Sequence, residues 1–95
     1  MREYELVTVW NPDLGEEGIT GQLERLGTAI AGRGGAVRES NIWGRRRLAY
    51  HINRHSEGVY VVMQVEMEPG RTAELERQLS INEDVLRHLL VRKDE

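Results

Sequence analysis

The sequence contains no cysteine, which excludes disulfides, thiolate nucleophiles and thiolate metal sites together. Its apolar runs, such as residues 59–63, are far shorter than the ~20 residues that a membrane-spanning helix needs. Residues 1–5 carry charges where a secretory signal would begin its apolar core. These absences predict a cytoplasmic protein that is neither secreted nor bound in a membrane.

Positive charge is also in short supply, since 13 lysines and arginines stand against 16 acidic residues and leave a formal net charge of -3. An acidic chain does not coat nucleic acid with its whole surface, so any such contact must come from a local basic patch. The chain has 95 residues, of which 39% are hydrophobic and 31% charged, a composition typical of a soluble folded protein. One core suffices at this length, so we expect a single domain over residues 1–95.

Periodicity along the chain predicts four strands and two helices. Alternation of side chains indicates strands, and apolar residues at intervals of three and four indicate helices. In chain order, the predicted elements are a strand over 4–10, a helix over 16–32, strands over 36–52 and 59–67, a helix that starts near Pro69, and a strand over 85–91. The order βαββαβ predicts a ferredoxin-like α+β sandwich, in which two helices cover one face of a four-stranded antiparallel sheet.

The long strand over 36–52 has features that bear on function. Its alternation changes phase at Gly44, which indicates a β-bulge. The polar segment 53–58 predicts a hairpin loop between this strand and the next. In the ferredoxin-like topology the long strand lies at a sheet edge, where unpaired backbone groups invite pairing with another chain. We therefore expect a protein partner to dock there.

A dense basic cluster, Arg45-Arg46-Arg47, lies within this strand. Strand alternation places Arg45 and Arg47 on one side and Arg46 on the other. Guanidinium groups bind phosphate oxygens in bidentate fashion, so contact with RNA is one hypothesis. The alternative is ion pairing with a nearby glutamate: Glu57, Glu66 or Glu68. The residues alone leave these two readings open.

Other residues extend or flank the cluster. Arg2 lies at the start of the first strand, and Arg87 and Arg92 lie on the last. Because those strands are neighbours in the predicted sheet, these arginines are candidates to extend the basic surface. The alternative is that each is merely solvated. Tyr50 shares a predicted face with Leu48 and Ile52, which favours a core or partner contact over stacking on a base. For Trp43 the choice stays open.

The segment Trp43 to Tyr50, WGRRRLAY, resembles the signature of the bacterial small-ribosomal-subunit protein six family. The opening residues 1–5, the Asn11-Pro12 turn and the segments 64–67 and 85–92 are similar to that family at matching positions. The chain has His51 where the family usually has proline, which leaves the path into the hairpin loop open.

The resemblance implies a ferredoxin-like fold, residence in the small ribosomal subunit, contact with the central domain of its ribosomal RNA, and pairing with the subunit's eighteenth protein. We accordingly predict RNA-binding residues and partner-binding residues. The predicted RNA-binding residues are Arg2, Arg45, Arg46, Arg47, Arg87 and Arg92, and the predicted partner-binding residues are Trp43, Leu48 and Tyr50. We expect no catalytic residue, cofactor, metal or small-molecule substrate, and no membrane contact.

Other classes of protein explain the sequence less well. An acylphosphatase-like enzyme on the same fold needs an arginine-bearing phosphate cradle, whereas the loop after the first strand, 11–14, carries a carboxylate and no arginine. A metal site on His51 and His55 would need a distant third ligand such as His88. A homodimeric ligand-sensing module is a further alternative, because this fold supports many functions.

Overall fold

The computed structural model describes residues 1–93, and its four strands form one antiparallel sheet in the order β2-β3-β1-β4. The strands are β1 (Arg2–Trp10), β2 (Ala36–Ile52), β3 (His55–Met67) and β4 (Val85–Arg92). The helices are α1 (Gly15–Gly32) and α2 (Thr72–Ile81), which follow the short 3-10 turns η1 (Pro12–Leu14) and η2 (Pro69–Arg71). The predicted ferredoxin-like order is confirmed, with β2 at an edge and β1 beside β4. Asp94 and Glu95 of the chain lie outside the described residues.

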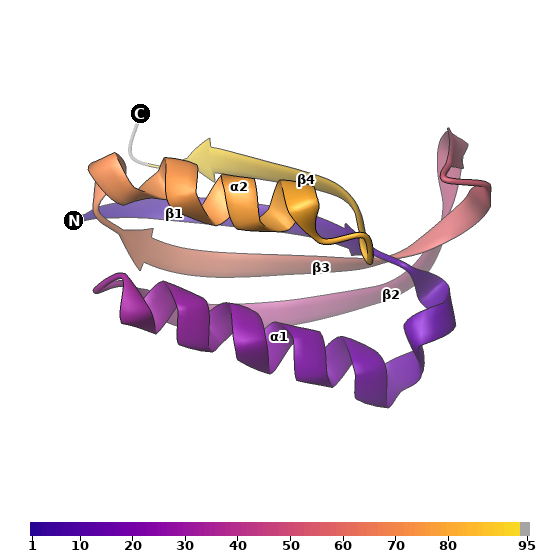
Figure 1. The fold of residues 1–95 in the computed structure, drawn as a ribbon, viewed down its shortest axis with the longest axis horizontal. Helices are drawn as coiled ribbons and strands as arrows, with labels where there is room; N and C mark the ends of the chain where they lie inside the picture. The colour runs from indigo at the N-terminus through magenta and orange to yellow at the C-terminus, as the bar shows by residue number, and fades with distance from the viewer. Residues whose placement is uncertain (94–95) are drawn as a thin grey trace.

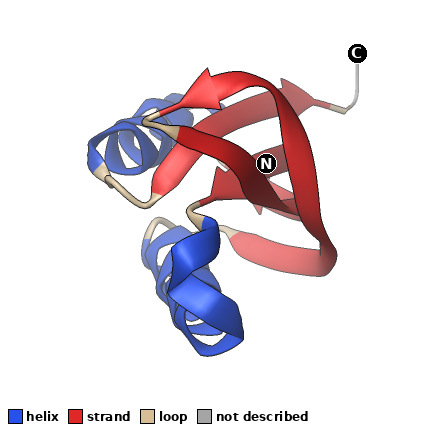
Figure 2. Ribbon diagram, turned by 90° about the vertical axis from the view of Figure 1, so that its right-hand side faces the viewer, coloured by secondary structure: helices blue, strands red, loops and turns tan. Residues whose placement is uncertain are grey.

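Both helices lie on the same side of the sheet (Figure 1, Figure 2), and the core lies between the two layers. Alternate residues of β1 and β3 face the helices, as the strand period predicts. The core cluster contains Tyr4, Leu6, Trp10, Val61, Met63, Val65 and Met67 from these strands, with Ile19, Leu26, Ile30, Leu75 and Leu79 from the helices. Each fully buried side chain of this size contributes roughly 1.5–3 kcal/mol.

Thr8 is the buried polar residue of β1, and its hydroxyl is satisfied within the core. The hydroxyl donates to the carbonyl of Val61 at 3.3 Å and accepts from the indole N–H of Trp10 at 2.7 Å. A buried hydroxyl or indole without a partner would cost about 1–3 kcal/mol. The pairing therefore lets a threonine and a tryptophan occupy an apolar layer.

The bulge predicted at Gly44 is confirmed. Ile42 lies opposite Val61 and Gly44 lies opposite Tyr60, so Trp43 is the extra residue on β2. Gly44 has a φ of +92°, which an L side chain rarely adopts. Glycine at this position therefore lets β2 change phase without losing its pairing with β3.

The loop predicted over 53–58 is wrong in its extent. Asn53 and Arg54 alone form the turn, with φ values of 49° and 70°, and Ile52 lies opposite His55. Positive φ at both central residues is the geometry of a two-residue hairpin turn. Residues 55–58 read as a loop because they are polar, but strand pairing uses backbone groups and does not require apolar side chains. β3 therefore starts four residues before its predicted beginning.

The early start of β3 creates a hairpin that extends past the end of β1, whose last pair on this side is Trp10 with Val59. We call residues 45–58 the hairpin arm. It bends away from the rest of the sheet at the right of Figure 1. Its register is irregular, since β2 and β3 pair at Arg47 with Glu57 and next at Ile52 with His55.

Candidate nucleic-acid interface

The hairpin arm gathers positive charge on a chain that is acidic overall. It contains four arginines and one glutamate, a formal charge of +3, so the remainder of the chain carries -6 if the total is -3. The arm includes Arg54, which sequence reasoning missed because it lay in the predicted loop. The sequence signal that could have identified Arg54 is its positive charge next to Asn53, a residue type common in turns. A local basic surface of this kind attracts polyanions despite an unfavourable net charge.

Arg45 is partly engaged inside the chain. Its guanidinium lies 3.3 Å from the Glu57 carboxylate across the strand pair and donates to the carbonyl of Pro12 at 3.5 Å. The ion-pairing alternative therefore describes Arg45 in the free protein. A guanidinium has five N–H donors, so these two contacts leave others available.

The other two glutamates considered as partners are occupied elsewhere. Glu66 binds Arg38 at 2.6 Å, and Glu68 lies 3.9 Å from the N-terminal amine of Met1. Ion pairing of the arginine cluster with either of them is therefore wrong. Glu57 is the carboxylate that reaches the cluster, through Arg45.

Arg46 and Arg47 differ from Arg45 in their surroundings. The guanidinium carbon of Arg46 lies 5.9 Å from the centre of the Trp43 ring, at the outer limit of a cation–π contact. Arg47 is exposed, and within residues 1–93 its side chain has no hydrogen-bond or ion-pair partner. The cluster therefore offers a free guanidinium at Arg47 and a stacked one at Arg46.

The aromatic residues beside the cluster are exposed rather than part of the core. Trp43 is 56% exposed and Tyr50 is 63% exposed, whereas Leu48 is 9% exposed. The core reading of Tyr50 is wrong, because the register shift between Arg47 and Ile52 breaks the alternation that placed it with Leu48. Trp43 and Tyr50 can meet a partner as they stand, whereas little of Leu48 is available.

The remaining candidate arginines do not join the arm in one patch. Arg2 begins β1, and Arg92 lies opposite Tyr4 near the same end of the sheet. Trp10 is eight positions after Arg2, which is a span of about 27 Å at ~3.4 Å per residue. Arg87, exposed on β4, lies opposite Val9 nearer the arm. The structure thus separates two basic regions at opposite ends of β1.

The pair of Arg38 and Glu66 yields a testable pKa. The hydrogen bond from Arg38 lowers the pKa of the Glu66 carboxyl below its ordinary value, and the positive charge of Arg38 adds to the effect. Its contribution to stability is therefore present above the pKa of the unfolded chain and is lost as pH falls through the lower folded value. We predict that Arg38→Gln returns the Glu66 pKa toward the ordinary range, as measured by NMR titration of the side-chain carboxyl. An unchanged Glu66 pKa would show that this ion pair does not form in solution.

Metal and membrane sites find little support in the described residues. Residues 1–93 contain no group of three histidine, aspartate or glutamate side chains placed to hold a metal ion. No helix in that part of the chain is both long and apolar enough to span a membrane.

The fold and the hairpin arm define a ferredoxin-like α+β protein that presents cations and exposed aromatics on a protruding strand pair. Comparison with known proteins agrees with this class. A family model described as Ribosomal protein S6 matches residues 3–92. The chain belongs to the ribosomal protein S6 family, whose members are structural proteins rather than enzymes.

The relatives match this chain over nearly its whole length. Small ribosomal subunit protein bS6 of Mycolicibacterium paratuberculosis is 46% identical over 94 residues, which cover 99% of this chain and 98% of the relative. The bS6 protein of Desulforamulus reducens is 41% identical over 95 residues and is covered completely, as is this chain. The crystal structure of 30S ribosomal protein S6 from Thermotoga maritima has a TM-score of 0.89 at 27% identity, and the match covers 97% of this chain and 87% of that one.

Proposed function

We propose that this protein is a structural constituent of the small ribosomal subunit in the bacterial cytoplasm, where it binds the central domain of small-subunit ribosomal RNA together with the eighteenth small-subunit protein. In this role it supports subunit assembly and translation. The observation that carries the proposal is the basic hairpin arm on an otherwise acidic chain. Membership of the ribosomal protein S6 family supports it, as do the relatives named as small-subunit proteins.

RNA contact is assigned first to the arm. Arg47 is free and exposed, Arg46 is exposed beside Trp43, and Arg45 retains donors after its internal contacts. Arg54 at the turn adds a fourth guanidinium. Because arginines on a narrow hairpin project from both of its sides, they suit the irregular backbone of folded RNA better than a flat duplex surface.

The second basic region supplies further RNA contacts in this proposal. Arg2 and Arg92 lie near the end of the sheet away from the arm. Arg87, opposite Val9, lies nearer the arm and adds a cation on that side. Two separated groups of cations on a rigid sheet would fix the orientation of the protein on its RNA, since phosphate contacts position a protein without reading sequence. The acidic remainder of the chain limits affinity for RNA alone.

The protein partner is assigned to the outer edge of β2. This strand pairs with β3 on one side and has no strand on the other within residues 1–93. Trp43 and Tyr50 are exposed large side chains on it, and Leu48 lies between the arginines and Tyr50. An open edge beside exposed aromatics is suited to β-augmentation by the eighteenth protein. A basic partner at this edge would add the cations that this chain lacks.

Co-sedimentation tests the proposal. Tagged full-length protein, added to lysate of its own cells, is expected to travel with small ribosomal subunits through a sucrose gradient at moderate salt. A homodimeric ligand-sensing module or an enzyme would remain at the top of the gradient. Recovery of the protein only in the top fractions, with the subunits intact, would refute the ribosomal assignment.

A further inference from the structure

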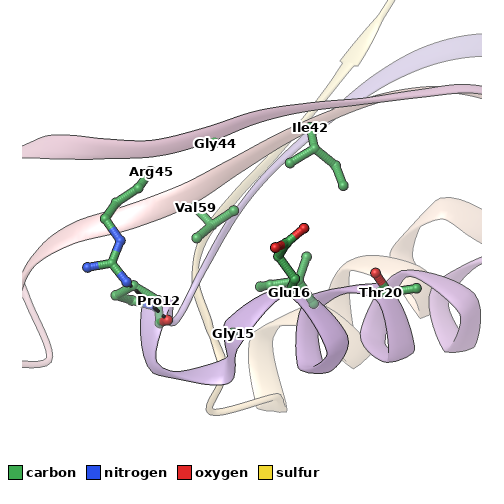
Figure 3. Close-up of a pocket in the computed structure, with 9 residues that line it drawn as sticks. Pro12, Gly15, Glu16, Thr20, Ile42, Gly44, Arg45 and Val59 are labelled. Carbon is green, nitrogen blue, oxygen red and sulfur yellow. Dashed lines mark hydrogen bonds between the residues drawn. The ribbon is translucent and has the colours of Figure 1, made fainter.

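A groove of about 440 Å³ lies between the first turns of α1 and the middle of β2. Figure 3 shows Ile42 and Val59 reaching toward it from the strands, Glu16 and Thr20 from the helix, and Arg45 at one end. We call this feature the α1–β2 groove. Its lining is partly apolar and partly charged. The middle is apolar, α1 contributes the acidic Glu16, and β2 contributes the basic Arg45.

Small residues on both elements leave part of the groove unfilled. Gly15 and Thr20 border it on α1, and Gly44 borders it on β2. Ile42 lies opposite the fully buried Val61 and therefore faces the helix layer, yet 57% of its surface is exposed. A large apolar side chain on the core side of a sheet is normally covered, so the groove has room for an apolar group from outside.

The groove opens beside the unpaired edge of β2. A peptide that pairs with this edge would point alternate side chains toward the helix layer, as β3 does on the other side. On β3, Val61 and Val59 lie opposite Ile42 and Arg45 and are two residues apart. An antiparallel peptide on the outer edge repeats this spacing, so residues opposite Arg45 and Ile42 would also be two apart, in that order.

Charge at the groove favours a protein segment over RNA. The Glu16 carboxylate has no ion-pair partner within residues 1–93 and would repel the repeated phosphates of an RNA strand. A protein segment can instead carry a single carboxylate and place it at the end of the groove where Arg45 lies (Figure 3). Arg45 retains free N–H donors after its contacts with Glu57 and Pro12, so it can donate hydrogen bonds to a carboxylate of the incoming chain.

We propose that the α1–β2 groove docks an extended segment of another protein, which pairs antiparallel with β2, inserts an apolar side chain against Ile42 and presents a carboxylate to Arg45 two residues earlier. The inference rests on the proposed function and deepens it, because it states the chemistry of the segment that binds the β2 edge. The expected pattern in the segment is an acidic residue, any residue, and then a leucine-sized apolar residue.

The test uses a capped hexapeptide, acetyl-Thr-Asp-Thr-Leu-Thr-Val-amide, titrated into the full-length protein with isotope-labelled methyl groups. The expected result is a saturable shift of the Ile42, Ile19 and Val59 methyl signals. Replacing the peptide's leucine by serine, or its aspartate by lysine, is expected to weaken binding at least five-fold. Shifts that do not saturate, or that ignore both replacements, would overturn the proposal.

Two protein variants and a matched control locate the site. Thr20→Trp fills the groove and Ile42→Ser removes its apolar wall, and both are expected to reduce peptide affinity about ten-fold. Thr28→Trp places the same bulky residue at an exposed position of α1 outside the groove and is expected to bind within two-fold of wild type. Thermal unfolding confirms that each variant is folded. If Thr20→Trp fails to fold, the peptide affinity of Ile42→Ser tests the proposal instead. Wild-type affinity in Ile42→Ser would contradict the proposal.

Other occupants give distinct results. Concentration-dependent shifts of the same methyl groups without peptide would identify a second copy of this chain, and loss of the peptide-induced shifts when an RNA fragment of the central domain is added would identify RNA as the occupant; either outcome overturns the proposal. Binding of purified eighteenth protein to wild type is measured separately. If the eighteenth protein does not bind, the proposed partner is wrong, and the peptide titration alone tests whether the groove binds a protein segment. If the eighteenth protein binds but the peptide does not, the inference about the groove is wrong and the proposed function stands.

Discussion

Replacing Arg45, Arg46 and Arg47 together by alanine is expected to weaken binding to a central-domain RNA fragment by roughly 100-fold, which corresponds to the loss of about two charge-assisted contacts at ~1.5 kcal/mol each. The plot of log affinity against log salt is expected to become shallower by about 1.5, since each of the two lost phosphate contacts removes a slope of ~0.7–0.9. The measurement is a filter-binding series at several salt concentrations. Unchanged affinity and slope would remove these arginines from the RNA interface.

Single substitutions separate the three arginines by their internal contacts. Arg47→Ala is expected to cost more affinity than Arg45→Ala, because Arg45 must share its guanidinium with Glu57 and Arg47 has no such partner within residues 1–93. Glu57→Gln releases Arg45 and is expected to tighten RNA binding. Arg77→Ala, at an exposed position of α2, is the control for loss of charge alone. Equal effects from Arg77→Ala and Arg47→Ala would indicate a general charge effect instead of a site.

The second large effect concerns Gly35, which joins the end of α1 to β2. A Cβ at this position would clash with the backbone carbonyl oxygen of Glu66 and would lie 3.0 Å from the Ile30 side chain. The Gly35 N–H also donates to the Ile30 carbonyl at 2.9 Å, so the segment is held from both sides. Gly35→Ala is expected to lower the free energy of unfolding by about 3 kcal/mol, because strand β3 cannot yield without disturbing its pairing with β1.

Urea unfolding followed by circular dichroism measures this loss, with Gly21→Ala and Gly27→Ala as controls. Both control glycines lie in α1, and a Cβ added at either position would have no neighbouring atom within 4 Å outside the helix's own backbone. Alanine in a helix interior is favoured over glycine by about 1 kcal/mol, so the controls are expected to raise stability. A loss below about 1 kcal/mol in Gly35→Ala would show that the α1–β2 connection can relax around the added methyl group.

Local pattern in the sequence was sufficient for most of the fold. The phase change at Gly44 correctly indicated the bulge, and the helix predicted over 16–32 ends at Gly32 as expected, shortly before Gly34 adopts a φ of +78°. Both signals are local, since a bulge or a helix end depends on the dihedral angles of one or two residues. The start of β3 was predicted four residues too late, because residues 55–58 have polar side chains although their backbone pairs with β2.

The candidate site was harder to predict because charge pairing joins residues that are distant in sequence. The cluster Arg45 to Arg47 could be found as a run of letters, yet only coordinates show that Glu57 engages Arg45 and leaves Arg47 free. The same holds for Glu66, whose partner Arg38 is 28 residues away. Tyr50 was assigned by alternation, and the irregular register of the arm removed the basis for that assignment.

The sequence by itself determined the order of elements, the bulge at Gly44 and the family, because periodicity records which side chains avoid water and a family signature is a string of residues. Tertiary structure decided which arginine is neutralised, which aromatics are exposed and where a groove opens beside β2. These depend on distances between separate elements, and a groove exists only where two elements meet with side chains too small to fill the space between them.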